Sequence, residues 1–330
     1  MSESQTGVTL PFAQNTAIVG GGALVCGLMN AVFNSLRLRR MLIPRIYIPD
    51  WRYNSLKRFY CHYGDNDMEQ ALGPEWSSYA RSLPFGTNLR ISQRVVEQLR
   101  GFQLARKFGL EIVTDRLDAR SFTSVLRRHR IDLMLVAGFG LKIPQSARLY
   151  LRKDDAPKGK KERAFIFHPS RALPNPTAKL LPQGSEYRGA AIFREVVQPR
   201  TLSEPLACAR PTARSEREPT LPELQVVMLE VGEDWDSGKI VEVGQCYQPP
   251  AFMEHELGPE FEDVRAQSVI DLTATMIGVL CRDRLHRRVF TADQMATCGF
   301  ERTTLLGMGY TEKEVRNAME RKKRRRQNGD

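Results

Sequence analysis

Short apolar runs alternate along this chain with segments of helical periodicity. The first run, residues 15–20, ends in Gly20-Gly21-Gly22 and leads into residues 23–36, where apolar side chains recur at helical spacing. Apolar strands that alternate with helices of this length are typical of a parallel sheet covered by helices on both faces. The pattern therefore predicts an α/β fold with a doubly wound, mainly parallel sheet.

The same alternation continues downstream. We expect further strands at residues 45–48, 111–114, 132–137, 225–231 and 239–243, and helices at residues 91–108, 121–130, 266–284 and, as short pieces, within 291–319.

Three polar stretches, near residues 152–163, 175–185 and 199–222, interrupt this pattern. They are rich in charge or in Pro, Ser and Thr, and we interpret them as surface insertions in one large domain. Past the last long helix, the chain changes to short helices and closes on a basic run. The sequence thus divides into an N-terminal extension (1–12), an α/β domain (13–285) and a helical extension with a basic tail (286–330).

The charge balance favours a polyanionic partner. Lys and Arg number 49 against 38 Asp and Glu, a formal net charge of +11, which points to RNA (tRNA or rRNA) or to a ribonucleoprotein. Lys158, Lys160 and Lys161 lie in one insertion. The closing basic run is interpreted as an RNA contact, with a nuclear-import patch or a solvated helix end as alternatives. It consists of Arg321, Lys322, Lys323, Arg324, Arg325 and Arg326.

Other features exclude several classes of protein. The six cysteines show no CxxC or CxxH spacing, so we expect neither a metal site nor a disulfide-linked partner. The longest apolar stretch, residues 17–33, is short and interrupted by glycines, so no membrane span is expected. The first 36 residues hold no Lys or Arg, which argues against a secretory signal and an Arg-rich transit peptide.

The three glycines at residues 20–22 suggest a dinucleotide-binding turn, but their spacing is wrong for one. A GxGxxG motif would need glycine at position 25, which is Val25, and an acidic residue about twenty positions on. Asp50 comes too late in the sequence for that role. A tight first turn between strand and helix is the better interpretation.

Three segments in a fixed order carry a resemblance to a known family. Residues 136–144 read VAGFGLKIP, residues 167–170 read FHPS with YRGAA at 187–191, and residues 230–240 read EVGEDWDSGKI. Together they resemble the formyltransferases that use 10-formyltetrahydrofolate, and among these the methionyl-tRNA formyltransferases. The resemblance covers roughly residues 13–285 and implies the same doubly wound fold.

The resemblance implies a role for each segment. His168 matches the histidine that stands beside the formyl oxygen, and Asp236 matches the aspartate that orients it, as a tetrahedral intermediate requires. The turn after residue 137 matches the segment that grips the pterin ring of 10-formyltetrahydrofolate. Its residues are Gly138, Phe139, Gly140, Leu141, Lys142, Ile143 and Pro144, while Tyr187, Arg188 and Gly189 match the part that faces the acceptor, where Arg188 suits a phosphate.

Two departures make the motif degenerate. The family has a catalytic asparagine two residues before the histidine, and here that position is Ile166, which can donate no hydrogen bond. The methionyl-tRNA formyltransferases also end in a small β-barrel, whereas this chain ends in predicted helices. Residues 305–310 resemble a ubiquitin-associated domain only faintly, and a helical hairpin packed on the α/β domain is the preferred interpretation.

Two functions are consistent with these residues. The first is a formyltransferase-like protein with lost or weakened catalysis that binds RNA or a ribonucleoprotein, such as the mitochondrial ribosome or its assembly intermediates. The second is an active formyltransferase that moves a formyl group from 10-formyltetrahydrofolate to methionyl-tRNA or another amine. The resemblance implies a mitochondrial location, with the cytoplasm or a bacterial source as the alternative.

Overall fold

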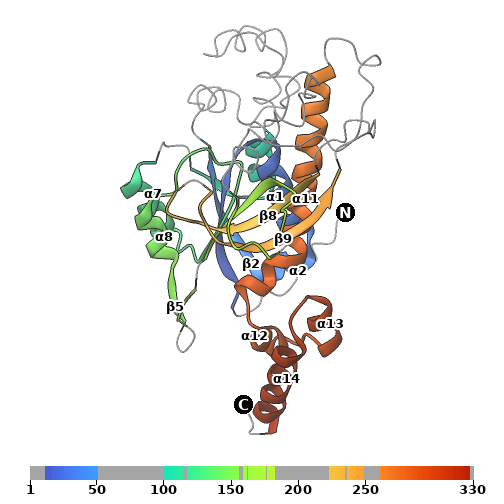
Figure 1. The fold of residues 1–330 in the computed structure, drawn as a ribbon. Coiled ribbons are helices and arrows are strands. Elements are labelled where there is room, and N and C mark those ends of the chain that lie inside the picture. The colour runs from blue at the N-terminus through green and yellow to red at the C-terminus, as the bar shows by residue number, and fades with distance from the viewer. Residues whose placement is uncertain are drawn as a thin grey trace, which may run out of the picture.

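A seven-stranded sheet crosses the protein in the order β3-β2-β1-β4-β7-β8-β9 (Figure 1). This computed structural model describes residues 12–50, 100–113, 117–155, 159–161, 163–175, 177–182, 223–234, 236–248 and 261–327. The strands are β1 (Gln14–Gly20), β2 (Leu42–Pro49), β3 (Glu111–Ile112), β4 (Leu133–Ala137), β7 (Ala164–Arg171), β8 (Leu224–Glu230) and β9 (Ile240–Tyr247).

The sheet is mainly parallel, as predicted. β1 pairs in parallel with β2 and β4, β2 with β3, and β4 with β7. β8 pairs antiparallel with both β7 and β9, so β8 alone among the described strands of this sheet runs against the others, and β9 forms the edge next to it. The helices are α1 (Gly22–Asn34), α2 (Leu36–Met41), α7 (Ala119–Arg128), α8 (Gln145–Leu151), α11 (Phe261–Val289), α12 (Ala292–Thr297), α13 (Arg302–Gly307) and α14 (Glu312–Gln327).

Helices cover both faces of the sheet because successive strand residues point to opposite sides. Ile18 faces the cluster that holds the buried residues of α1 and α11, such as Leu28 and Ile277. Val19 faces the other cluster, which includes Phe122 of α7 and Ala147 of α8. The doubly wound arrangement is therefore confirmed.

The triple glycine forms a tight turn between β1 and α1. Gly20 has a φ of +140°, and a Cβ placed on it would lie 1.7 Å from the carbonyl oxygen of Ala137. No larger residue fits where β1 meets the end of β4. The glycines thus serve close packing at this turn, as the spacing of the motif indicated.

The predicted helix over residues 23–36 is in fact two helices. α1 ends at Asn34, and Ser35 adopts an extended conformation in which its side chain accepts a hydrogen bond from the backbone N–H of Leu38 at 3.3 Å. Serine is a preferred helix N-cap because its oxygen satisfies a free N–H of the first turn. The chain therefore starts α2 here, in a new direction, and leads directly into β2.

The insertion at residues 152–163 contains a two-stranded hairpin. β5 (Lys153–Asp155) pairs antiparallel with β6 (Gly159–Lys161) between α8 and the start of β7. Lys158 lies outside the described residues. Because the hairpin comes immediately before β7, it projects from the amino ends of the parallel strands (Figure 1).

The C-terminal helices also attach at the amino ends of the parallel strands. Arg163, just before β7, donates a hydrogen bond to the carbonyl oxygen of Val289 at 3.2 Å, and the rings of Phe12 and Phe290 lie 5.2 Å apart. α11 continues to Val289, so the boundary placed after residue 285 falls inside this helix. Figure 1 shows α12, α13 and α14 beyond this edge of the sheet.

The loop between α13 and α14 is buried against α11. Met308 and Tyr310 belong to the same hydrophobic cluster as the α1–α11 layer, and the Tyr310 hydroxyl donates to the carbonyl oxygen of Phe290 at 3.2 Å. This is the helical packing preferred for the segment at residues 305–310. The basic run at residues 321–326 is helical and belongs to α14.

His286 links this loop to α11 and makes the docking sensitive to pH. Its Nε2 lies 2.8 Å from the carbonyl oxygen of Met308, so the proton resides on Nε2, and burial, aided by Arg37, Arg287 and Arg284, lowers its pKa. Below about pH 6.5 the unfolded chain binds a proton at His286 more readily than the folded chain does. The free energy of unfolding therefore decreases as the pH is lowered.

We expect the wild-type chain to lose about 1 kcal/mol more stability between about pH 7.5 and 5.5 than His286→Gln, since one proton changes stability by at most about 1.4 kcal/mol per unit. Glutamine retains an N–H for Met308 and does not titrate. Urea unfolding at both pH values measures the difference. Equal losses in the two proteins would assign the pH dependence to other groups.

Candidate functional site

His168 lies at the carboxyl side of the parallel part of the sheet. Phe167 pairs with Ala137, the last residue of β4, and His168 follows one residue later, opposite Val227 of β8. The sequence motif predicts His168 at the end of its strand, but β7 runs on to Arg171 because it continues to pair with β8. The histidine therefore lies in the middle of a strand, paired with β8 and one residue past the end of β4.

Asp236 meets His168 from the loop that joins β8 to β9. Its Oδ2 lies 3.2 Å from Nε2 of His168, with 17% and 8% of the two side chains exposed. Such a contact fixes the orientation of the imidazole ring. The two residues that the motifs paired are thus in direct contact.

The β8–β9 loop is shaped by short side chains. The Ser237 hydroxyl accepts a hydrogen bond from the backbone N–H of Asp234 at 2.9 Å, and a Cβ on Gly238 would lie 1.5 Å from the carbonyl oxygen of Glu230. Asp236 itself has a φ of +49°, which costs free energy for any residue other than glycine. The fold accepts this strained backbone at the residue that contacts His168.

The turn after β4 lies beside the same loop. Gly138 has a φ of +65° and packs so closely on the Gly21 carbonyl that a Cβ would lie 2.4 Å from its oxygen. Lys142 reaches across to Asp234, with 3.0 Å between Nζ and Oδ1. Ile143 is buried, and Pro144 is the N-cap residue of α8. The structure therefore brings the turn, His168 and Asp236 together.

Asp50 fixes this turn through a hydrogen bond to its backbone, a role that the sequence motifs do not indicate. Its buried carboxylate accepts a hydrogen bond from the backbone N–H of Gly140 at 2.9 Å, while its own N–H donates to the carbonyl oxygen of Gly20 at 3.1 Å. A signal was present in the sequence, because Asp50 directly follows an apolar strand. A buried acid at the end of a strand commonly serves neighbouring backbone N–H groups.

Ile166 replaces the expected asparagine with an apolar contact. Residues two apart on a strand share a face, so its side chain lies beside that of His168. There it packs against the clusters around Ala164 and around Leu181, Val227 and Leu229. The position is filled by hydrocarbon and offers no donor to an oxyanion.

The residues fit a folate cofactor only in part. In the described part of the chain, the Gly140 N–H donates to Asp50, whereas no acceptor is present for the N–H of Leu141. One backbone donor of this turn is thus available to a ligand. At the reacting end, His168 and Asp236 are present but Ile166 is apolar. The described residues contain no cluster of His, Cys, Asp or Glu that could hold a metal ion.

The structure does not place the remaining candidate residues at this site. Tyr187, Arg188 and Gly189 lie outside the described residues. The basic residues of α14 lie at the opposite edge of the sheet, since α11 delivers the C-terminal helices to the amino ends of the strands. Among the described helices none is long and apolar enough to cross a membrane.

Comparisons with known proteins give structural likenesses only. No protein-family model matches the sequence. No curated protein matches it either. Among solved structures, the chain is similar to glycinamide ribonucleotide transformylase 1 from Symbiobacterium toebii, with a TM-score of 0.42, 11% identity, and 83% of this chain and 88% of that chain covered.

Two further likenesses are of the same order. Phosphoribosylglycinamide formyltransferase from Streptococcus pneumoniae gives a TM-score of 0.39 at 11% identity, with 80% of this chain and 96% of that chain covered. A formyltetrahydrofolate deformylase from Pseudomonas putida gives 0.39 at 12% identity, with 81% and 64% covered. The strand order and pairing described above define the fold independently of these likenesses.

Proposed function

We propose that this chain is a formyltransferase-like protein with lost or strongly weakened catalysis. It binds RNA or a ribonucleoprotein through the surface at the amino ends of the parallel strands. The observation that carries the proposal is Ile166. It fills the place of a catalytic donor with an apolar side chain packed into the neighbouring clusters, while His168 and Asp236 remain in contact beside it.

The position of the basic elements supports a partner site separate from the His168 site. α2 directly precedes β2, the β5–β6 hairpin directly precedes β7, and the end of α11 contacts Arg163 just before β7. All three therefore lie at the amino ends of the parallel strands. An RNA bound there has no need to reach His168, which stands at the other edge.

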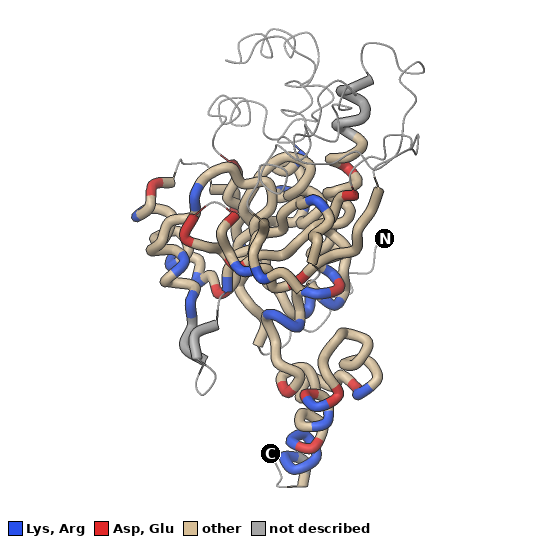
Figure 2. Tube along the Cα trace, viewed as in Figure 1, with Lys and Arg blue, Asp and Glu red and all other residues tan. Residues whose placement is uncertain are grey.

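At the amino ends of the strands, α14 carries some cations that form ion pairs and others that do not. Arg321 and Arg325 pair with Asp293 of α12, at 3.8 and 3.1 Å between nitrogen and oxygen. Lys323 and Arg324 are exposed and have no such partner among the described residues. Figure 2 shows the row of Lys and Arg along this helix. Exposed, uncompensated cations on a rigid helix are suited to phosphate contacts.

We expect the double variant Lys323→Gln, Arg324→Gln to weaken RNA binding and to flatten its salt dependence. Removing one cation from a phosphate lowers the slope of log affinity against log salt by about 0.7 to 0.9, so removing two lowers it by about 1.5. Titration of a labelled tRNA and an rRNA fragment at several salt concentrations measures the slope.

Lys239→Gln is the control for this experiment, because Lys239 is exposed on the loop beside His168. Its removal should leave RNA affinity and slope nearly unchanged. An equal effect of Lys239→Gln would place RNA at the His168 site, and no effect of the double variant would make the end of α14 a solvated helix end.

An active formyltransferase is the second candidate, favoured by the 3.2 Å contact between His168 and Asp236. In that case 10-formyltetrahydrofolate is the donor, held by the turn at residues 138–144, with methionyl-tRNA or another amine as acceptor. His168 would carry the proton of the attacking amine while Asp236 orients its ring. Formyl transfer assays on Ile166 variants decide between the two candidates.

A mitochondrial location and association with ribosomal particles complete the proposal. They are supported by the resemblance to enzymes that serve organellar initiator tRNA and by the basic surface at the amino ends of the parallel strands. Cell fractionation followed by sedimentation through a sucrose gradient tests both. Recovery in the cytosol, free of ribosomal particles, would contradict this part of the proposal.

A further inference from the structure

Three arginines near the ends of α2 and α11 form no ion pair in the fold or site described above. Arg37 and Arg39 lie on α2, and Arg284 lies on α11. Neighbouring arginines have acidic partners, such as Arg282 with Asp283 at 2.9 Å. Within the described ranges, no carboxylate lies within ion-pair distance of Arg37, Arg39 or Arg284. Arg39 and Arg284 are exposed and Arg37 is half-buried, so their charges can meet an external anion.

Helix electrostatics does not explain Arg37. The macrodipole favours cations in the last turn of a helix, which is where Arg39 and Arg40 lie, and disfavours them in the first turn. Arg37 is the second residue of α2, where its charge faces the positive end of the helix. The dipole of α2 therefore gives no reason for a cation at this position.

The arginines of α2 continue into the basic side of α14. The guanidinium of Arg40 lies 5.9 Å from the centroid of the Phe300 ring, just before α13. Burial raises the pKa of the Cys298 thiol, and Arg40 from α2 and Lys322 from α14 both oppose that rise. Arg325 of α14 also donates to Oγ1 of Thr297 at 3.0 Å, so α2 and α14 both contact the segment around Cys298. We name the set Arg37, Arg39, Arg40, Arg284, Lys322 and Lys323 the junction surface.

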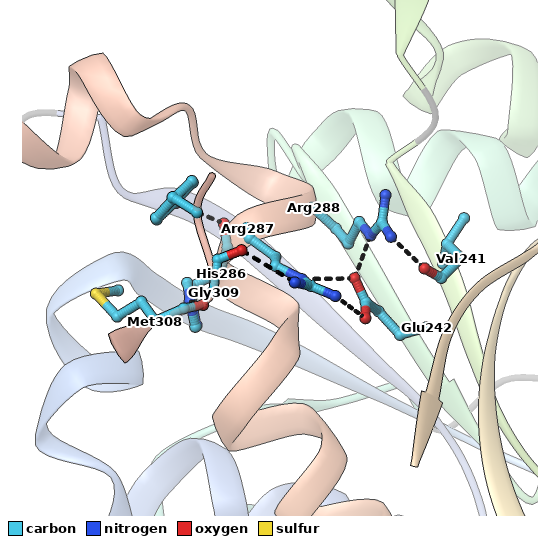
Figure 3. A network of polar contacts seen from close by, with 8 residues as sticks. Val241, Glu242, His286, Arg287, Arg288, Met308 and Gly309 are labelled. Carbon is cyan, nitrogen blue, oxygen red and sulfur yellow. Dashed lines mark hydrogen bonds and ion pairs between the residues drawn. The ribbon is translucent and has the colours of Figure 1, made fainter. Parts of the chain in front are cut away.

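An ion-pair network around the buried Glu242 fixes the end of α11, next to Arg284, against the sheet and the loop that leads to α14 (Figure 3). Glu242 of β9 accepts hydrogen bonds from both Arg287 and Arg288 at the end of α11, one of them from Nε of Arg287 at 2.8 Å. Arg287 also donates to the carbonyl oxygen of Gly309 at 3.0 Å. The sheet, α11 and the loop before α14 are therefore tied together.

This network leaves the junction surface strongly cationic. Among the described residues, Glu242 pairs with Arg287 and Arg288, and Asp293 pairs with Arg321 and Arg325. The guanidiniums of Arg284 and Arg287 both lie close to Gly309, 3.2 and 2.9 Å from where its Cβ would stand. Cations held this close by a rigid frame need no reorganisation to bind a row of phosphates.

We propose that the junction surface binds the phosphate backbone of one RNA strand that runs from α2 to α14. This rests on the proposed function and specifies where and how the RNA lies. The strand places its first phosphates on Arg37, Arg39 and Arg284 and continues past Arg40 to Lys322 and Lys323. The sequence alone indicates the α14 end of this surface but not the α2 end.

The test compares the full-length wild-type chain with the triple variant Arg37→Gln, Arg39→Gln, Arg284→Gln. Binding of oligouridine of about 4 and about 16 nucleotides, lengths that bracket common single-strand sites, is titrated over a salt series. For the longer oligonucleotide the triple variant should lower the slope by about two to three. The short one should show a smaller change, because it cannot span the surface.

A second triple variant, Arg120→Gln, Arg128→Gln, Lys239→Gln, is matched in charge but changes exposed cations elsewhere. It should alter the slope by less than about one. Equal slopes for the two triple variants would overturn the inference, because net charge alone would then explain binding. Binding to phosphatidylserine vesicles is measured in parallel. If the Arg37, Arg39, Arg284 variant lost binding to the vesicles but not to oligouridine, the inference would also be overturned, because these arginines would then belong to a lipid-binding surface.

The outcomes also separate this inference from the proposed function. A wild-type chain that binds no RNA at low salt overturns both. This inference alone is overturned if the wild-type chain binds RNA and its RNA affinity is lowered by Lys323→Gln with Arg324→Gln but not by the α2 and α11 changes.

Discussion

Formyl transfer by the wild-type chain is expected to be at least about a hundredfold slower than by an enzyme with the asparagine, and Ile166→Asn is expected to restore part of that loss. Asparagine at this position would lie beside His168 on the same face of β7, where its amide can donate to a developing oxyanion. Initial rates of formyl transfer from 10-formyltetrahydrofolate to methionyl-tRNA measure the change.

The gain must depend on His168 if it reflects chemistry at this site. Ile166→Asn combined with His168→Ala should show no gain, and Ile166→Leu should leave the rate unchanged. Because Ile166 packs into two apolar clusters, asparagine should also cost about 1 to 3 kcal/mol of stability, which thermal unfolding measures. A wild-type turnover of about 1 to 10 per second would refute the loss of catalysis.

Glu242→Gln is expected to destabilise the protein by about 3 kcal/mol, the lower end of the range for breaking a buried ion pair. Glu242 is 4% exposed and contacts two arginines, Arg287 and Arg288, whose charges lose this acidic partner when it is neutralised. The lower end applies because both arginines are partly exposed and can recover some hydration. Urea unfolding measures the difference.

Asp283→Asn is the matched control, since Arg282 and Asp283 form an exposed pair on the same helix. It should cost at most about 1 kcal/mol. The effect of Glu242→Gln should also be seen as faster proteolysis within residues 290–327, because Arg287 no longer holds the loop at Gly309. Equal stability losses for the two variants would show that the Glu242 network contributes no more than a surface pair.

Much of the geometry of the candidate site could be predicted from local sequence together with the family resemblance of the ordered motifs. A histidine after a buried strand, an aspartate in a Ser-Gly loop and a glycine-rich turn each depend on backbone features that neighbouring residues determine, such as Gly20, Gly138 and Gly238. The ordered motifs then placed His168 and Asp236 together, and they lie 3.2 Å apart. The exact strand position of His168 was missed, because the pairing of β7 with β8 involves residues far apart in sequence.

The sequence by itself determined the alternation of strands and helices, the apolar residue at position 166 and the excess of basic residues, because periodicity, residue identity and charge are local properties. Only the tertiary structure decided which cations act together. Arg40 and Lys322 are distant in sequence and flank one junction, while Arg321 and Arg325 are compensated by Asp293. A charge interacts with whatever lies within a few ångströms of it, and those neighbours are set by the packing of α2, α11 and α14.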